Sequence, residues 1–377
     1  MQSYPAIQNE APLSIAVGDF NGDGKLDFVV ANGLSFNAAG VTGDTVSVYL
    51  NQGAGTFAPA TTFSTGIAPT GISVSDLNHD GILDLAVANS GQVDENFPPG
   101  SDTVSVLLGN GDGTFGPQST YVVDETPVSL VAADVNGDGI PDLAVAIGGQ
   151  FVDGLDGGFV SVLLNNGDGT FAAQTSYAVG GGAVALTAGD FNGDCQPDLA
   201  VANFFDGTVS ILLNVGGGRF SSQMTYPTGL SPSAVVAKDV NGDGILDLAL
   251  VTSDSSQNGD VAILLGRGDG TFRPVVSTPV GAPTFPGGAL ETIVAADFSG
   301  HGFVDLAVGN HNGGWVTVLL NDGTGNFSHT DVAQAGPILL SVAAGDFDGD
   351  GRPDVVYTTS DSNGDGTAGL LLSSCQR

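Results

Sequence analysis

The sequence predicts an all-β fold, a seven-bladed β-propeller built from four-stranded antiparallel blades. Two observations lead to this prediction. A segment first seen at residues 18–32 recurs seven times in the 377 residues, and a glycine-rich segment that ends in phenylalanine follows each of the first six copies. Repeats of about 50 residues that each hold four short strands are typical of propeller blades.

The recurring segment reads GDFNGDGKLDFVVAN in its first copy and GDFDGDGRPDVVYTT in its last. Successive copies begin 57, 58, 56, 49, 58 and 49 residues apart. Their first aspartates are Asp19, Asp76, Asp134, Asp190, Asp239, Asp297 and Asp346. This spacing indicates one structural unit repeated along the chain rather than several different domains.

Each unit contains four short apolar runs, separated by the glycines and prolines that favour turns. In the first unit we expect strands at 13–19, 26–32, 45–50 and 57–65. We expect the seven blades at about 11–67, 68–125, 126–181, 182–230, 231–285, 286–335 and 336–377, the last blade being completed by residues 1–10.

The two ends of the sequence complement one another. The seventh unit stops at LLLSSCQR, before its fourth strand, and the opening segment QSYPAIQ resembles QTSYAVG at 174–180, which is a fourth strand. We therefore expect the N-terminal strand to complete the last blade and to close the ring without a covalent link.

The composition limits the partners of the chain. Its 41 acidic residues against 7 Lys and Arg give a net charge of −34, yet 41% of the residues are hydrophobic, enough to form a large core. So acidic a surface repels nucleic acids and anionic lipids. The sequence contains no run of about 18 consecutive apolar residues, so it predicts no membrane span. No basic segment followed by an apolar one opens the chain, so we expect any secretory signal to be absent from it.

Each copy follows the pattern Asp-x-Asn/Asp-x-Asp-Gly-x-x-Asp, which places oxygen ligands at alternate positions of a tight loop. Calcium takes six to eight oxygen ligands and fits this pattern better than magnesium or zinc. In the first loop we expect the side chains of Asp19, Asn21, Asp23 and Asp27 and the carbonyl of Lys25 as ligands. The equivalent ligands are Asp76, Asn78, Asp80, Ile82 and Asp84; Asp134, Asn136, Asp138, Ile140 and Asp142; Asp190, Asn192, Asp194, Gln196 and Asp198; Asp239, Asn241, Asp243, Ile245 and Asp247; and Asp346, Asp348, Asp350, Arg352 and Asp354.

Three loops depart from the pattern. In the sixth, Ser299 and His301 replace two polar ligands, so we expect a weak or empty site with Asp297, Ser299, Phe303 and Asp305 as its remaining candidates. Cys195 in the fourth loop and His79 in the second stand where other loops have glycine. We expect about six calcium ions and a seventh, degenerate site. Calcium is roughly millimolar outside cells and far scarcer inside, so weak calcium sites indicate a secreted or cell-surface protein.

With these loops the chain resembles the FG-GAP/VCBS repeat family over its whole length. That family includes the head propeller of integrin α subunits and calcium-containing seven-bladed fungal lectins. The resemblance implies a calcium-loaded propeller that binds glycans or proteins. Some extracellular polysaccharide lyases also resemble it in architecture.

The strand order places the metal loops and the glycine turns on one face, and the more variable connections on the opposite face. Variable loops commonly carry recognition. We expect aromatic and histidine side chains there to contact a ligand, with Trp315 as the favoured residue. The candidates are Phe36, Phe97, Phe151, Phe204, Phe205, His311 and Trp315.

The leading hypothesis is therefore a secreted, monomeric, calcium-binding module for adhesion or recognition, with a glycan or an extracellular protein as its ligand. One alternative is a scaffold domain of a larger surface protein. Another is an extracellular carbohydrate-active enzyme that uses loop carboxylates such as Asp94 and Glu95. We expect no enzyme, because the face opposite the metal loops offers almost no Lys or Arg to neutralise an anionic substrate. The Arg267-Gly268-Asp269 tripeptide falls in a hairpin slot and needs no adhesive role.

Overall fold

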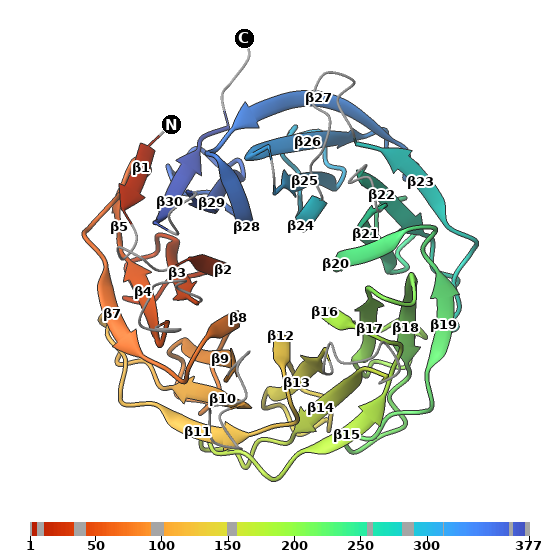
Figure 1. The fold of residues 1–377 in the computed structure, drawn as a ribbon, viewed down its shortest axis with the longest axis horizontal. Helices are drawn as coiled ribbons and strands as arrows, with labels where there is room; N and C mark the ends of the chain where they lie inside the picture. Colours follow the sequence, from red (N-terminus) through yellow and green to blue (C-terminus); the bar gives the residue numbers. More distant parts are fainter. Residues whose placement is uncertain are drawn as a thin grey trace.

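The chain folds into a closed ring of seven four-stranded antiparallel sheets around a central channel (Figure 1). The predicted fold class is confirmed. The computed structural model describes residues 2–5, 11–33, 43–91, 102–148, 157–254, 259–280, 290–311, 313–361 and 365–373. In these ranges no helix is long and apolar enough to cross a membrane.

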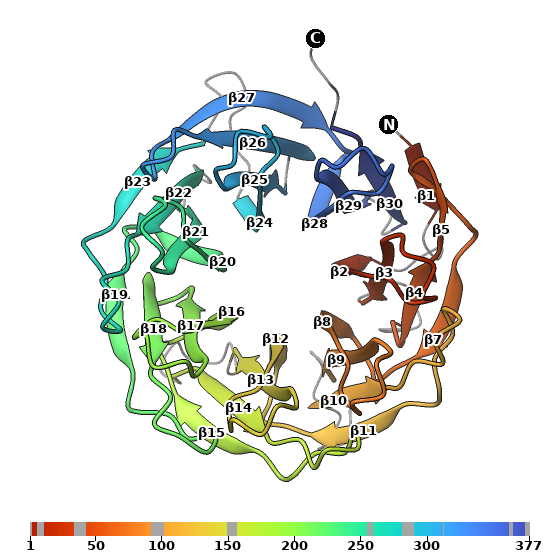
Figure 2. The same cartoon turned by 180° about the vertical axis from the view of Figure 1, so that it is seen from behind.

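Within each blade the strands lie in order from the channel to the rim, as both views of the ring show (Figure 2). The innermost strands are β2 (Pro12–Gly18), β8 (Pro69–Ser75), β12 (Pro127–Ala133), β16 (Ala183–Gly189), β20 (Ser231–Lys238), β24 (Leu290–Ala296) and β28 (Ile338–Gly345). The second strands are β3 (Asp27–Asn32), β9 (Asp84–Ser90), β13 (Asp142–Ile147), β17 (Asp198–Asn203), β21 (Asp247–Ser253), β25 (Asp305–Asn310) and β29 (Asp354–Ser360).

The outer half of each blade completes the sheet. The third strands are β4 (Thr45–Tyr49), β10 (Asp102–Leu107), β14 (Phe159–Leu163), β18 (Thr208–Leu212), β22 (Gly259–Leu264), β26 (Trp315–Asn321) and β30 (Gly366–Leu371). The outermost strands are β7 (Thr61–Ser64), β11 (Ser119–Val122), β15 (Thr175–Ala178), β19 (Met224–Pro227), β23 (Val276–Pro279), β27 (Phe327–Gln334) and β1 (Gln2–Pro5). A small hairpin, β5 (Asn51–Gly53) with β6 (Thr56–Phe57), belongs to the first blade.

The last blade is closed by the N-terminal strand, as the sequence predicts. Strand β1 pairs antiparallel with β30, so that Ser3 lies opposite Gly369 and Tyr4 opposite Ala368. The ring of Tyr4 packs edge-on against Phe57 of the first blade at 5.4 Å. The two ends of the chain therefore join the last blade to the first.

The core is distributed over the blade interfaces, with one apolar cluster at each. The second strands make this possible because they are buried on both faces. In β13, Leu143, Val145 and Ile147 pack toward the second blade, while Ala144 and Ala146 pack toward the fourth. Alternate residues of one strand thus serve two interfaces, which is why these strands are continuously apolar.

The innermost strand of every blade contains a β-bulge near its beginning. In β2 the register passes from Pro12 to Ser14, leaving Leu13 unpaired. The corresponding unpaired residues in the other blades are Thr70, Val128, Val184, Ser233, Glu291 and Leu340. A bulge redirects the side chain of its extra residue, and here it does so where the strand borders the channel.

One strand boundary was predicted wrongly. The sequence suggests that the fourth strand of the first unit begins at Phe57, but β7 starts only at Thr61. Phe57 is instead buried, with its ring 4.7 Å from that of Phe28 and 5.8 Å from that of Phe347 in the last blade. Packing across the blade interface holds this part of the chain away from the outer strand.

Candidate metal centres and recognition face

Each predicted metal loop connects the innermost strand of a blade to its second strand. In the first loop, Asp19 accepts hydrogen bonds from the N–H groups of Asp23 (3.2 Å) and Gly24 (2.8 Å), and Asn21 accepts another from Asp23 (2.9 Å). The Lys25 N–H donates to Asp23 (3.0 Å). The turn is thus fixed by the same side chains that the sequence assigns to a metal.

These bonds recur around the ring. The first aspartate of the loop accepts an N–H bond of 2.7–2.8 Å from the residue five positions later in all seven loops. The residue at the seventh position donates to the fifth in the six complete loops, the further donors being Ile82, Ile140, Gln196, Ile245 and Arg352. The loops therefore share one backbone conformation.

The last aspartate of each loop is buried, and in the first six blades it ties the metal loop to the glycine turn of its own blade. Asp27 is 0% exposed; its Oδ2 accepts the Phe20 N–H (3.0 Å) and its Oδ1 accepts the Asn51 N–H (2.7 Å). Equivalent pairs of bonds are made by Asp84, Asp142, Asp198 and Asp247. In the sixth blade Asp305 accepts the Ser299 N–H and the Asn321 N–H, and in the seventh, which has no glycine turn, Asp354 accepts the Phe347 N–H and the Ser373 N–H. This structural role was not predicted from the sequence, although an aspartate at the start of the most buried strand is a signal for it.

Burial changes the acidity of these aspartates. It raises the pKa of Asp27, Asp142 and Asp198 from 3.8 to about 6, against the opposing effect of the backbone hydrogen bonds. The pKa values of Asp84, Asp247 and Asp354 are raised by burial as well. A nearby cation favours the charged carboxylate and offsets this cost.

The seventh loop shows how well the residues fit a calcium ion. Asp346, Asp348 and Asp354 each place a carboxylate oxygen within 4.8 Å of the other two. Calcium binds oxygen at about 2.3–2.6 Å, so ligands on opposite sides of one ion lie up to about 5 Å apart. The first five loops have asparagine where this loop has Asp348, and an amide oxygen is also a calcium ligand.

The sixth loop keeps the turn and its first and last aspartates but lacks the two polar ligands between them. Gly302 N–H donates to Asp297 Oδ2 (2.7 Å), and the Ser299 hydroxyl donates to Asp297 Oδ1 (3.2 Å). Phe303 is 43% exposed beside this loop. Its backbone therefore folds as in the other loops, with serine and His301 in place of two polar ligands, and the weak or empty site stays a prediction.

Two loops contain side chains in the left-handed region that favours glycine. Cys195 has φ of 66° and His79 has φ of 61°, where other loops have glycines. Cys195 is exposed and unpaired. Both residues thus occupy strained backbone positions, which agrees with their being substitutions for glycine rather than ligands.

Replacing Cys195 with glycine should stabilise the protein. We expect C195G to raise the free energy of unfolding by about 1 kcal/mol, because it removes the penalty of a left-handed residue with a Cβ atom. Denaturant unfolding in calcium measures the gain. C195S is the control, since it removes the thiol and keeps the strain; an equal gain in C195S would contradict the explanation.

The glycine turns also connect neighbouring blades. Asn165, at the start of the turn in the third blade, donates from Nδ2 to Leu77 O (2.7 Å) in the metal loop of the second blade. Asn51, Asn214 and Asn321 make the same contact with the preceding blade. In the second and fifth blades, where that position is glycine, Gly113 and Gly270 donate backbone N–H groups to Phe20 O and Phe191 O instead. Each of these metal loops is therefore hydrogen-bonded both within its own blade and to the glycine turn of the next blade.

The repeat that builds these loops and turns is a known one. The FG-GAP-like repeat pattern matches residues 19–87, 89–145, 151–201, 190–250, 239–308 and 297–357, which together span most of the chain. The chain belongs to the FG-GAP-like repeat family. No curated protein sequence matches it significantly.

Solved structures resemble this FG-GAP-like propeller over almost its whole length. One is a lectin from Agrocybe aegerita, studied for its specific recognition of non-reducing terminal N-acetylglucosamine (TM-score 0.54, 20% identity, 97% of this chain and 87% of that one). Others are chains from crystals of BBS1N in complex with ARL6DN, soaked with mercury (0.60, 13%, 99% and 95%) or with lead (0.57, 14%, 100% and 98%). At these identities the similarity shows the shared fold.

The recognition face is the face of the FG-GAP-like propeller opposite the metal loops. Phe204 and Phe205 lie on it, in the connection between β17 and β18, with their rings 5.6 Å apart. Phe205 is 54% exposed and rests over Gly182, where an added Cβ would come within 2.6 Å of its ring. The Gly181 N–H donates to Asp206 (2.8 Å), so the linker before the blade supports this aromatic pair.

His311 and Trp315 belong to the sixth blade, separated from the phenylalanine pair by the fifth. His311 Nδ1 lies 2.9 Å from Glu291 Oε2 and 3.2 Å from Leu339 O. Because a carbonyl only accepts, Nδ1 carries a hydrogen. The hydrogen bond that His311 donates to Glu291 raises the pKa of His311. Trp315 is half-buried and covers Gly313. Ligand binding by these residues stays a prediction.

The other candidates on this face stay predictions, because Phe36, Asp94, Glu95, Phe97 and Phe151 lie outside the described residues. Asp269 of the Arg-Gly-Asp tripeptide accepts bonds from the Thr271 N–H (3.0 Å) and hydroxyl (2.6 Å), as Asp112 does from Thr114 in the second blade. The tripeptide therefore has the ordinary hairpin conformation of these turns.

Proposed function

We propose that this chain is a secreted propeller that binds calcium in six of its seven loops and recognises uncharged glycans on its recognition face. The exposed ring of Phe205 carries the glycan proposal. It presents a flat apolar surface, and such surfaces stack on the apolar faces of sugar rings. A net charge of −34 favours uncharged sugars over acidic ones.

The calcium proposal rests on the donor set. Six loops offer three or four carboxylates each, and oxygen ligands in a preformed turn suit calcium. Of the 41 acids, 21 occupy the side-chain ligand positions of the seven loops. Calcium sites of moderate affinity fill at the millimolar calcium found outside cells, which supports secretion.

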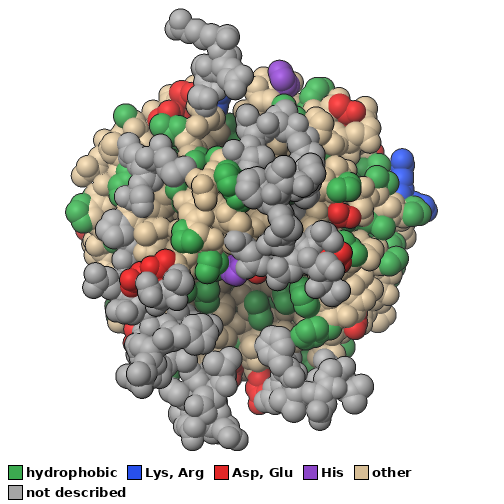
Figure 3. Space-filling model, turned by 45° about the horizontal axis from the view of Figure 1, so that its top comes forward, with side chains coloured by type: hydrophobic (Ala, Val, Ile, Leu, Met, Phe, Trp, Pro, Cys, Tyr) green, Lys and Arg blue, Asp and Glu red, His purple; other side chains and the backbone are tan. Residues whose placement is uncertain are grey.

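The distribution of basic residues favours binding over catalysis. Among the described residues every Lys and Arg lies in or beside a metal loop or a glycine turn: Lys25, Arg219, Lys238, Arg267, Arg273 and Arg352. Figure 3 accordingly shows few basic side chains, near the outline of the molecule. A recognition face without described Lys or Arg side chains lacks the permanent positive charges that stabilise an anionic transition state. The recorded N-acetylglucosamine recognition of the Agrocybe aegerita lectin supports a carbohydrate ligand here too.

A glycan array probed with labelled protein, in millimolar calcium and again in chelator, tests the proposal. We expect binding to a related set of neutral sugars that weakens in chelator. F205A should reduce this binding at least tenfold, whereas V215A should leave it unchanged, because Val215 is similarly exposed (60%) in a glycine turn of the same blade, on the opposite face. A blank array in calcium, or full binding by F205A, would overturn the glycan proposal and favour a protein ligand instead.

A further inference from the structure

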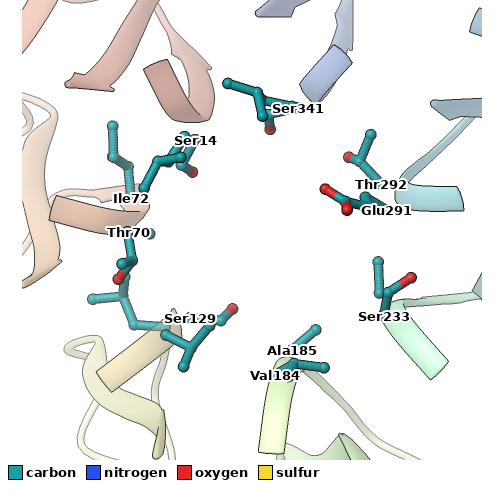
Figure 4. Close-up of a pocket in the computed structure, with 16 residues that line it drawn as sticks. Ser14, Thr70, Ile72, Ser129, Val184, Ala185, Ser233, Glu291, Thr292 and Ser341 are labelled. Atoms are coloured by element: carbon teal, nitrogen blue, oxygen red, sulfur yellow. The ribbon is translucent and has the colours of Figure 1, made fainter. Parts of the chain in front are cut away.

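A cavity of about 220 Å³ lies at the mouth of the central channel (Figure 4). Its lining comes from the first residues of the innermost strands of all seven blades. The metal loops follow the other ends of these strands, so the cavity opens on the recognition face. The cavity is separate from the metal loops, and neither Phe204 nor Phe205 is among the residues that line it.

The bulges described above supply part of this lining. The seven unpaired bulge residues all border the cavity, and six of them are uncharged: Leu13, Thr70, Val128, Val184, Ser233 and Leu340. The seventh is Glu291, the one charged side chain among the residues that line the cavity. The sixth blade therefore places a carboxylate where the other blades place aliphatic or hydroxyl groups.

Glu291 is held in a defined position but remains accessible. His311 binds its Oε2 at 2.9 Å, and His311 is itself fixed by Leu339 of the seventh blade through a 3.2 Å contact to the carbonyl. The Glu291 side chain is still 39% exposed. Figure 4 shows its carboxylate directed toward the cavity.

The rest of the lining combines hydroxyl and aliphatic groups. Six residues of the lining carry hydroxyls: Ser14, Thr70, Ser129, Ser233, Thr292 and Ser341. Thr70 and Ser233 already donate their hydroxyls to backbone carbonyls, so their oxygens can serve a ligand only as acceptors. Leu13, Ile72, Leu130 and Leu340 contribute apolar surface. A carboxylate beside neutral donors and acceptors matches a ligand with one positive charge on a small polar body.

We propose that the mouth of the channel is a second binding site, for a small molecule that bears a primary ammonium group, with Glu291 as the charge partner of that group. The volume sets the size of the ligand. Pockets for drug-sized molecules measure roughly 300–1,000 Å³, so about 220 Å³ holds one sugar unit or a short alkyl amine. The ammonium could be carried by either, and the experiment distinguishes the two sources.

Titration calorimetry on the calcium-loaded protein at physiological salt tests this site, with glucosamine and n-butylamine as probes and glucose and n-butanol as their uncharged counterparts. We expect at least one amine to bind more tightly than its counterpart. Binding of glucosamine alone identifies an amino sugar, binding of butylamine alone an alkyl amine, and binding of both an ammonium site indifferent to the carrier. Neither amine exceeding its counterpart would overturn the proposal.

Variants separate this site from the general attraction of an acidic protein. E291Q keeps an oxygen for His311, and E291L installs the residue found at this position in the first and last blades. Both should weaken amine binding at least about tenfold, as expected for loss of a charge-assisted hydrogen bond. D44N removes an exposed charge on the same face, outside the cavity lining, and should change the affinity less than twofold. Unchanged binding by E291L, or an equal loss in D44N, would contradict the assignment.

Discussion

We expect removal of calcium to lower the melting temperature of this propeller by about 3–10 °C. Extracellular calcium modules have dissociation constants of about 0.1–1 mM, so 1 mM calcium stabilises each site by about 0.4–1.4 kcal/mol. Six such sites together would contribute about 2–8 kcal/mol, and for a domain of this size each kcal/mol shifts the melting temperature by roughly 1.3 °C. Calorimetry in 1 mM calcium and in excess chelator measures the difference.

Magnesium provides the control for this prediction. Because magnesium demands a small octahedron and gives up its water reluctantly, replacing calcium with magnesium should restore only a minor part of the loss. A melting temperature that is the same in calcium and in chelator would show that the loops do not hold calcium. If magnesium restored the melting temperature in full, the loops would bind divalent cations without the predicted preference for calcium.

Replacement of a buried loop aspartate should be the most damaging single substitution in a metal loop. D142A removes the acceptor of the Val135, Asn136 and Asn165 N–H groups. The bonds of Val135 and Asn165 are buried, and each buried group left without a partner costs about 1–3 kcal/mol. We therefore expect D142A to lower the free energy of unfolding by about 2–6 kcal/mol even without calcium. In calcium it should lose one metal site as well.

D305A is the matched control, because Asp305 ends the degenerate sixth loop and likewise joins it to the following turn, accepting the Ser299 N–H (2.9 Å) and the Asn321 N–H (2.9 Å). The quantity to compare is the stability that calcium adds to each variant. D142A should lose about one sixth of that increment, and D305A none. If the increment shrinks equally in both variants, the sixth loop binds calcium like the others; if it shrinks in neither, Asp142 is not a ligand.

The fold was predictable because the apolar pattern, the loop motif and the repeat spacing all indicate the same four-stranded blade. A strand such as β13 is continuously apolar because its alternate residues face two blades, and the aspartate that precedes it marks where the loop ends. The N-terminal strand was placed correctly because its sequence resembles that of β15. Repetition makes such inferences strong, since seven copies in register leave few alternatives.

The contacts that join the blades were not predictable in the same way. The bond from Asn165 to Leu77 O spans 88 residues, and nothing local distinguishes that asparagine from an ordinary turn residue. The burial of Asp27 against Asn51 depends on the same three-dimensional arrangement. Glu291 could not be singled out from the sequence, because it is one of 41 acids and no local pattern marks it. The β-bulge that directs it toward the channel is visible only in the structure.

A count of bound calcium tests the central claim most directly. The protein is dialysed against about 10 mM calcium, which fills sites with dissociation constants of about 0.1–1 mM to roughly nine-tenths or more. Its metal content is then measured by mass spectrometry against a protein-free dialysis control. We predict about six calcium ions for each chain, and about five for D142A, from the six complete loops of the sequence. A ratio near zero would contradict the claim that this propeller is stabilised by calcium, whatever ligand its recognition face binds.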